Sequence, residues 1–304
     1  MSARETKPLQ RLKESDWDIL MRRIRDKKCT PILGTETRSE EFMIRSEIAR
    51  TWAQEYDFPL ASTVNLARVS RYVSVKFDPE FTKEELVKRL RQAPQPNFQD
   101  ANDPYRILAR LPLPVYITTN YDDFMFQALK SADRDPRREI CRWWNTDEVN
   151  GPASIFDQGF DPTVANPVVF HFHGVTAELE SLVLTEDDYF EFLINVSRYS
   201  MVPPRIQRAM AGTSLLLLGY RLDDWDFRVM FHLLASHLKI STSQTHVAVQ
   251  IAPVADEAPE EQREKAQAYL DLYFQRYKNL NLRIYWGSCR DFITELDRRW
   301  RNYA

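Results

Sequence analysis

The stretch Val115-Tyr-Ile-Thr-Thr-Asn-Tyr-Asp122 is a short apolar run that ends abruptly in an amide and a carboxylate. Two further runs have the same form, Val168-Val-Phe-His-Phe-His-Gly174 and Leu215-Leu-Leu-Leu-Gly-Tyr220. Short apolar runs of this kind are typical of strands that are buried on both faces of a parallel sheet. Open α/β folds bind ligands at the carboxyl edge of such a sheet, so the residues that end these runs are the first candidates for a functional site.

Strand-like and helix-like segments alternate outward from these runs. Strands are predicted over residues 29–33, 115–119, 168–172, 214–218, 245–251 and 282–286. Helices are predicted from Ser15 or Asp16 to Lys27, over 105–111, and near 223–238 and 258–278. This alternation predicts an α/β fold with a doubly wound, mostly parallel, Rossmann-like sheet.

The segment between the first two strands has helical periodicity only, and one of its helices is expected to begin at the capping box Thr82-x-x-Glu85. We therefore predict a single domain over residues 1–304 with a helical insertion at about residues 45–110. The segment 132–166 contains Gly, Pro, Asn and Asp, which predicts irregular or short β structure.

Composition narrows the function classes. A net charge of -3 argues against general or direct sequence-specific nucleic-acid binding. The charged N-terminus has no apolar signal core, and no apolar run approaches the ~20 residues of a membrane helix, so we expect a cytoplasmic protein without a membrane partner. The chain has three widely separated cysteines, too few for a four-cysteine zinc module.

The residues at the C-terminal ends of the three apolar runs allow more than one interpretation. A glycine such as Gly219 permits either a tight turn or a close backbone approach to a ligand. Asn120 is placed to reach a ligand, although Asn120 and Asp122 could simply cap the following helix. His171 and His173 lie two residues apart and would share one face of a strand.

A metal site is a further possibility for the histidine pair. Aspartates are available as additional ligands, and a metal-dependent hydrolase or nuclease therefore stays open. These aspartates are Asp122, Asp123, Asp223, Asp224 and Asp226. Acidic residues at helix N-termini explain the same positions equally well.

In this chain order, the motifs resemble those of the sirtuin-like domain family that acts on NAD, especially its bacterial branch in antiphage defence. The resemblance rests on Thr118-Thr-Asn-Tyr-Asp-Asp-Phe124, Phe172-His-Gly174, Val183-Leu-Thr-Glu-Asp-Asp-Tyr189 and Leu217-Leu-Gly-Tyr-Arg-Leu-Asp-Asp224. It spans roughly residues 15–290.

The resemblance implies that Asn120 and His173 are the catalytic pair. Cleavage of the nicotinamide–ribose bond builds positive charge on the sugar, so Asn120 would orient a water and a neutral His173 would accept a proton from a ribose hydroxyl. Asp122 would line the nicotinamide pocket, and Gly219 with Tyr220 would approach the adenosine or ribose. NAD is the implied substrate, and no zinc is expected. The missing zinc-binding cysteines also disfavour a protein deacylase.

The first glycine loop departs from the family pattern Gly-Ala-Gly-x-Ser. Here Gly34 and Thr35 are followed by Glu36, whose carboxylate would stand where the backbone meets the pyrophosphate. Arg38 is the residue that would compensate this charge. Gly34, Thr35 and Arg38 are therefore candidate NAD-binding residues, with weakened or altered binding expected.

The resemblance implies an NAD glycohydrolase that depletes NAD in antiphage defence and is switched by assembly. A homo-oligomer is expected, and a ring-forming DNA-translocase ATPase is the first partner to test. The altered loop supports an alternative, a degenerate nucleotide-binding scaffold without catalysis. The metal-dependent nuclease remains a third possibility.

Overall fold

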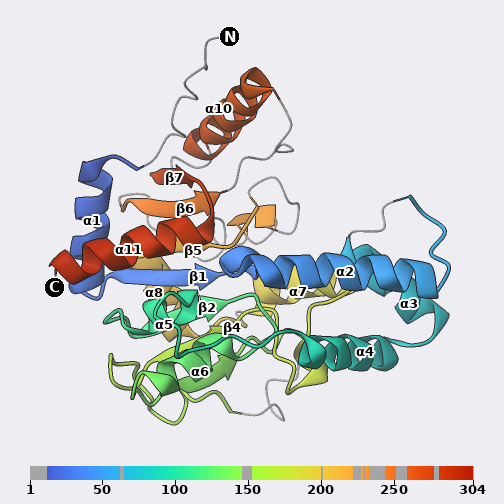
Figure 1. The fold of residues 1–304 in the computed structure, drawn as a ribbon. Coiled ribbons are helices and arrows are strands. Elements are labelled where there is room, and N and C mark those ends of the chain that lie inside the picture. The colour runs from blue at the N-terminus through green and yellow to red at the C-terminus, as the bar shows by residue number, and fades with distance from the viewer. Residues whose placement is uncertain are drawn as a thin grey trace.

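The computed structural model describes residues 12–61, 65–145, 153–199, 201–221, 227–228, 231–232, 244–250, 259–276 and 281–303. Within these residues, seven strands form one parallel sheet in the order β3-β4-β2-β1-β5-β6-β7 (Figure 1). The strands are β1 (Cys29–Leu33), β2 (Val115–Thr118), β3 (Arg137–Ile140), β4 (Val168–His171), β5 (Ser214–Leu218), β6 (His246–Gln250) and β7 (Leu282–Trp286). The predicted Rossmann-like α/β fold is thereby confirmed.

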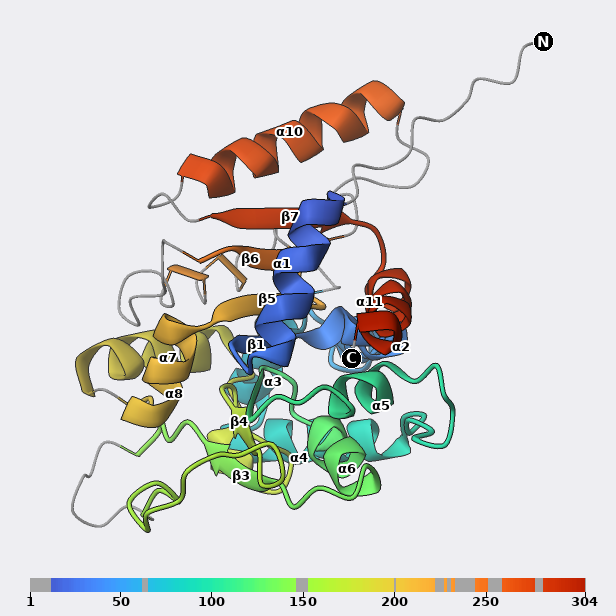
Figure 2. The same ribbon diagram turned by 90° about the vertical axis from the view of Figure 1, so that its left-hand side faces the viewer.

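Helices cover both faces of this sheet (Figure 2). The first face carries α1 (Glu14–Arg25), α5 (Pro104–Ala109), α6 (Phe124–Ser131) and α11 (Cys289–Tyr303). The second carries α7 (Glu186–Tyr199), α8 (Pro204–Gly212) and α10 (Glu260–Arg276). Strand β5 is apolar throughout because both of its faces are buried. Leu216 and Leu218 pack with the helices of the first face, and Leu215 and Leu217 pack with those of the second.

Three helices lie beyond the carboxyl ends of the central strands, where the β1 arrow points in Figure 1. They are α2 (Ser39–Glu55), α3 (Leu66–Lys76) and α4 (Pro79–Gln92), preceded by the 3₁₀ turn η1 (Thr35–Thr37). Their buried residues form a third cluster that also takes in Tyr121, from the loop after β2, and Leu184, which follows the 3₁₀ turn η2 (Leu179–Ser181). This helical layer is therefore packed directly against the carboxyl edge of the sheet.

The predicted helix start at Thr82 is wrong. Helix α4 begins at Pro79, and the carboxylate of Asp78 caps it by accepting the amide of Phe81 at 2.7 Å. Thr82 lies buried inside the helix, and its hydroxyl donates to the Asp78 carbonyl at 2.9 Å. The combination of Asp before Pro at the first helical position was the stronger signal.

Other differences from the predicted elements are small. Helix α1 has Lys13 as its N-cap, two or three residues before the predicted caps Ser15 and Asp16. Strands β2 and β4 end at Thr118 and His171, each one residue sooner than predicted. Most of the helix predicted near 223–238 lies outside the described residues. No helix in the described ranges has the length and apolar composition needed to cross a membrane.

Candidate functional site

The centre of the sheet contains a topological switch point. Strand β1 lies between β2 and β5, so the chain leaves β1 toward one side and later crosses to the other. Loops that depart in opposite directions open a crevice at the carboxyl ends of such strands, which is where doubly wound folds bind ligands. Gly34 and Gly219 directly follow β1 and β5, and Asn120 lies two residues after the end of β2.

Hydrogen bonds hold the three strand ends together. The Asn120 side-chain amide donates to the Gly34 carbonyl at 3.1 Å and to the Tyr105 hydroxyl at 3.2 Å. The Tyr220 hydroxyl donates to the Leu33 carbonyl at 3.1 Å. The structure therefore brings together four of the predicted site residues, Gly34, Asn120, Gly219 and Tyr220.

The two glycines at this point serve close packing between backbones. A Cβ on Gly34 would lie 2.6 Å from the Gly219 carbonyl oxygen, and Gly219 has a φ of +76°. The amide of Gly34 donates to the Leu218 carbonyl at 2.8 Å, and that of Glu36 donates to the Gly219 carbonyl at 3.0 Å. Amides of the first glycine loop are thus already bound to carbonyls of β5 and the turn after it.

The charged residues of this loop face different neighbours. Glu36 Oε1 lies 3.8 Å from a guanidinium nitrogen of Arg221, a cation that the sequence analysis did not single out. The Arg38 guanidinium lies 5.8 Å from the centre of the Phe124 ring, at the start of α6. Phe124 also lines the pocket described below.

His173 lies in the loop after β4 and is almost completely buried. Its imidazole makes edge contacts with Tyr189 and Phe192 of α7, at ring-centre distances of 5.4 and 5.0 Å. Burial, reinforced by the positive charge of Arg45, lowers the pKa of His173 to about 3. The imidazole is therefore neutral at physiological pH.

His171 and His173 do not share a face, contrary to the prediction. His171 is the last residue of β4, and its Nε2 lies 3.5 Å from Asp123 Oδ1, at the start of α6 on the first face of the sheet. His173 packs against α7 on the second face. The strand ends between them, so the two-residue periodicity no longer applies.

Asn120 and His173 come from adjacent segments of chain. The amide of Phe172 donates to the Thr118 carbonyl at 2.8 Å, and the amide of Thr176 donates to the Tyr121 carbonyl at 2.8 Å. These two bonds bracket both residues, although the Asn120 amide turns toward β1 and α5 whereas the His173 ring packs on α7. Only 1% of Asn120 and 6% of His173 is exposed, so both are nearly closed off from solvent.

A pocket of about 170 Å³ lies between the helical layer and the β2–α6 turn, which begins directly after Asn120. The residues that line it include Arg45, Arg91, Tyr121, Asp122 and Phe124. The Arg45 guanidinium lies 4.2 Å from the centre of the Tyr121 ring. Burial raises the pKa of Asp122 to about 6, even though Arg45 favours its charged form.

Arg45 is a second residue of this site, after Arg221, that the sequence did not reveal. Its charge acts on both Asp122 and His173, which links the pocket to the buried imidazole. Nothing in its sequence context distinguishes it from an arginine on a solvated helix face, because α2 combines many charged and apolar residues.

The metal-site interpretation receives no support from the part of the chain that the structure describes. No group of three or more His, Cys, Asp and Glu residues that could hold a metal ion occurs there. Cys29, Cys141 and Cys289 are each buried and free. The candidate ligands Asp223, Asp224 and Asp226 lie outside the described residues.

Comparison with known proteins gives two results. A family model described as a SIR2-like domain matches residues 114–279, just over half of the chain. An NAD(+) hydrolase ThsA from Enterococcus faecium is 24% identical over 125 residues, which are 41% of this chain and 23% of that protein. An NAD(+) hydrolase ThsA from Cytobacillus dafuensis is 26% identical over 142 residues, 46% of this chain and 26% of that protein. The aligned regions thus span about a quarter of each relative.

Proposed function

This chain belongs to the SIR2-like domain family, and on that premise we propose that it is an NAD glycohydrolase. It cleaves the bond between nicotinamide and ribose and so depletes NAD. The observation that carries the proposal is the pairing of β2 with β4, which brings an amide and a neutral imidazole behind adjacent strands. Tyr121 and Asp122, which directly follow Asn120, line a pocket together with Arg45. The partial similarity to two NAD(+) hydrolases supports the same substrate.

The chemistry of this bond suits these groups. Departure of nicotinamide leaves positive charge on the ribose, which a polar, water-poor site stabilises better than bulk water does. Asn120 orients the attacking water, which bonds to C1′ of the ribose as the bond to nicotinamide breaks and releases one proton to the solvent. His173 accepts a proton from a ribose hydroxyl and returns it when the product has formed. Asp122 and Arg45 offer an acceptor and a donor for the carboxamide of the nicotinamide, so the pocket holds the leaving group.

Burial of the catalytic pair favours control by assembly. With Asn120 and His173 almost unexposed, side chains at the pocket must move before a dinucleotide reaches both. Arg45 over Tyr121 is the best placed of these side chains. Formation of a homo-oligomer, or of a complex with a ring-forming DNA-translocase ATPase, would shift the population toward the open form. Such a switch fits an antiphage effector, which must be inactive until infection.

One observation favours a second candidate function, a scaffold that binds nucleotide without turnover. The amides of Gly34 and Glu36 are bound to carbonyls of the protein, and the Glu36 carboxylate stands in the same loop. A pyrophosphate would have to displace these contacts and approach a negative charge. Binding through this loop would then be weak.

Release of nicotinamide from NAD tests the proposal. The purified chain, alone and with any co-purified partner, is incubated with NAD, and nicotinamide is quantified by chromatography. Asn120→Ala and His173→Ala are expected to abolish release, whereas Asn102→Ala, at an exposed loop position, leaves it unchanged. Binding of NAD without turnover in every assembly state supports the scaffold instead. Equal rates in Asn120→Ala and the unmodified protein contradict the assigned roles.

A further inference from the structure

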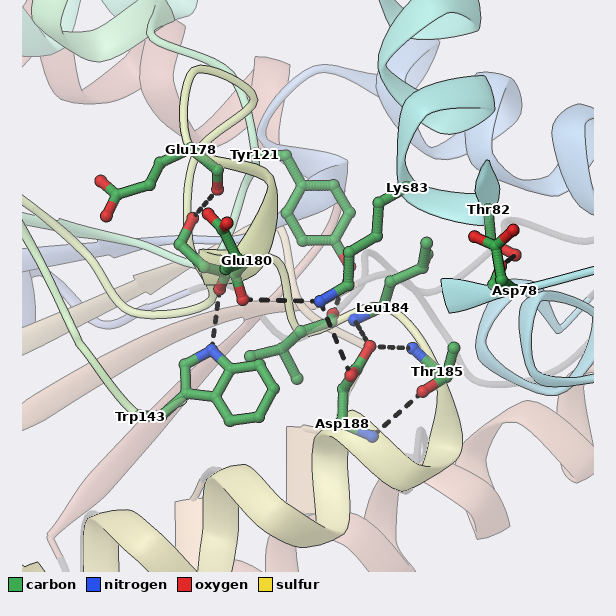
Figure 3. A network of polar contacts seen from close by, with 12 residues as sticks. Asp78, Thr82, Lys83, Tyr121, Trp143, Glu178, Glu180, Leu184, Thr185 and Asp188 are labelled. Carbon is green, nitrogen blue, oxygen red and sulfur yellow. Dashed lines mark hydrogen bonds and ion pairs between the residues drawn. The ribbon is translucent and has the colours of Figure 1, made fainter. Parts of the chain in front are cut away.

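Lys83 is a buried cation on α4, with only 11% of its side chain exposed. Its ammonium lies 3.7 Å from Asp188 Oδ1, donates to the Glu180 carbonyl at 3.5 Å and lies 5.6 Å from the centre of the Trp143 ring (Figure 3). Removing an ammonium from water is costly unless partners replace the lost hydration. Lys83 therefore joins the helical layer to three separate segments of the domain.

Asp188 uses its other carboxylate oxygen to fix the start of α7. Oδ2 accepts the amides of Leu184 at 3.0 Å and Thr185 at 2.8 Å, and the Asp188 amide donates to the Thr185 hydroxyl at 3.0 Å. This reciprocal arrangement is a capping box, with its carboxylate three residues after the capping threonine. Figure 3 shows the Lys83 ammonium approaching this same carboxylate from α4. The position of the first turn of α7 thus depends on a side chain from the helical layer.

The two α7 residues whose rings contact the His173 imidazole lie within about one helical turn after Asp188. Tyr189 directly follows Asp188, and Phe192 lies one turn further on, at 5.4 and 5.0 Å from the imidazole. A second route leads to the same place, because Trp143 lies under Lys83 and makes an edge contact of 6.4 Å with Phe192. Lys83 is therefore connected to the surroundings of His173 twice.

The loop that carries His173 is held from the same side. The Val183 amide donates to the His173 carbonyl at 3.1 Å, and the Val183 carbonyl accepts the Tyr121 hydroxyl at 2.6 Å. Trp143 Nε1 donates to the Ser181 carbonyl at 2.8 Å. Segment 181–188 consequently links the β2 loop, the His173 loop and α7 in one contact network. Figure 3 shows the part of this network around Lys83, Tyr121, Trp143 and Asp188.

We propose that Lys83 is a positioning residue for His173: through Asp188 and Trp143 it sets where α7 places Tyr189 and Phe192 against the imidazole. The inference rests on the proposed function for its catalytic meaning, since His173 is the proposed proton acceptor. It goes beyond that function by making the packing of α4 a determinant of the site. Displacement of α4, which also lines the pocket with Leu90 and Arg91, would then misplace the imidazole.

The chain offers a matched control on the same helix. Lys88 is 65% exposed in its side chain and pairs with Glu85 within α4 at 3.0 Å. Substitution of either lysine by methionine removes one charge and keeps an unbranched side chain of high helix propensity. Only the Lys83 substitution removes the contact to Asp188, so a difference between the two variants reports on that contact.

The first arm of the test does not depend on activity. Histidine is labelled with ¹³C, and the ring signals of His173 are identified by their loss in His173→Gln. The ring currents of Tyr189 and Phe192 contribute to the chemical shifts of these signals. A changed position of either ring relative to the imidazole therefore changes the shifts. We expect Lys83→Met to shift the His173 signals well beyond any change in Lys88→Met. Lys83→Arg, which keeps the charge, is expected to restore most of the original positions.

The second arm measures steady-state cleavage of NAD. A misplaced acceptor lowers kcat roughly tenfold in Lys83→Met with little change in KM, because the pocket residues remain. Lys88→Met keeps both values. If the unmodified protein releases no nicotinamide, the proposed function fails while the signals of His173 still decide the present inference.

Asp188→Asn provides an independent variant, because it weakens the pairing with Lys83 but keeps an oxygen for the amides of Leu184 and Thr185. Shifted His173 signals in this variant support the inference even if Lys83→Met does not fold. Unchanged His173 signals in Asp188→Asn, or in a folded Lys83→Met, overturn it. Loss of folding in both variants also overturns it, in favour of a role in stability alone.

Discussion

Acidification should destabilise the unmodified protein more than His173→Gln. The pKa of His173 is lowered to about 3 in the folded state from an ordinary value of 6.5. Between these values the unfolded chain binds a proton that the folded chain does not, so the free energy of unfolding falls as the pH falls through this window. Above about pH 6.5 both states are neutral, and the contribution disappears.

The magnitude follows from the same values. A pH of 5 lies 1.5 units below the ordinary pKa of 6.5, so the imidazole of the unfolded chain is protonated. Each pH unit corresponds to about 1.4 kcal/mol of stability. His173 thus removes about 2 kcal/mol of stability between pH 7 and pH 5. Glutamine does not titrate, so His173→Gln should lose about 2 kcal/mol less over the same interval.

Other titrating groups are present in both proteins, so their contributions to the pH dependence of stability largely cancel in the comparison. The pKa of His171 is lowered to about 4 by burial, although Asp123 favours its charged form, and this adds a loss of the same sign. Asp122 has the opposite effect, because a carboxyl with its pKa raised to about 6 regains stability as the pH falls through that value.

Urea unfolding followed by circular dichroism at pH 7 and pH 5 provides the free energies. The account requires the two proteins to differ in pH dependence by about 2 kcal/mol. Equal losses in both would refute it, because His173 would then titrate alike in the folded and unfolded states. Its proposed role as a neutral acceptor would lose its physical basis.

Three further substitutions test the packing and charge of the site. Gly174→Ala forces a residue with φ of +86° to place its Cβ into the Ser181 carbonyl, whereas Gly159, with φ of +83°, has open space around it. We expect Gly159→Ala to cost about 1 kcal/mol in urea unfolding and Gly174→Ala at least about 2 kcal/mol more; equal costs would show that the loop relaxes freely. Glu36→Gln should lower the Kd for NAD by about threefold to tenfold in calorimetric titration, an effect that shrinks with added salt. An unchanged Kd would mean that the pyrophosphate lies away from this loop.

The sheet could be predicted from sequence because its strands are unusually explicit. Leu215 to Leu218 is apolar throughout, which only a strand buried on both faces requires, and Gly219 ends it where a positive φ is needed. Helix boundaries were less predictable. Thr82 matched a capping pattern, yet Asp78 and Pro79 begin the helix three residues earlier.

The site was predictable only to the level of which strand ends meet. Strand order places the residues after β1, β2 and β5 together. Periodicity does not extend past the last paired residue of β4, His171, so His171 and the following loop residue His173 were wrongly assigned to one face. Contacts contributed by the helical layer had no local signal. Arg45 and Lys83 resemble ordinary surface charges in sequence, and tertiary packing alone places them beside Tyr121 and Asp188.

A crystal structure of Asn120→Ala with NAD bound tests the central claim most directly, because this variant should bind the dinucleotide without cleaving it. We expect the nicotinamide ring in the pocket beside Asp122 and Arg45, and its ribose between position 120 and His173. A dinucleotide bound elsewhere on the molecule, with the ends of β2 and β4 unchanged, would contradict the account.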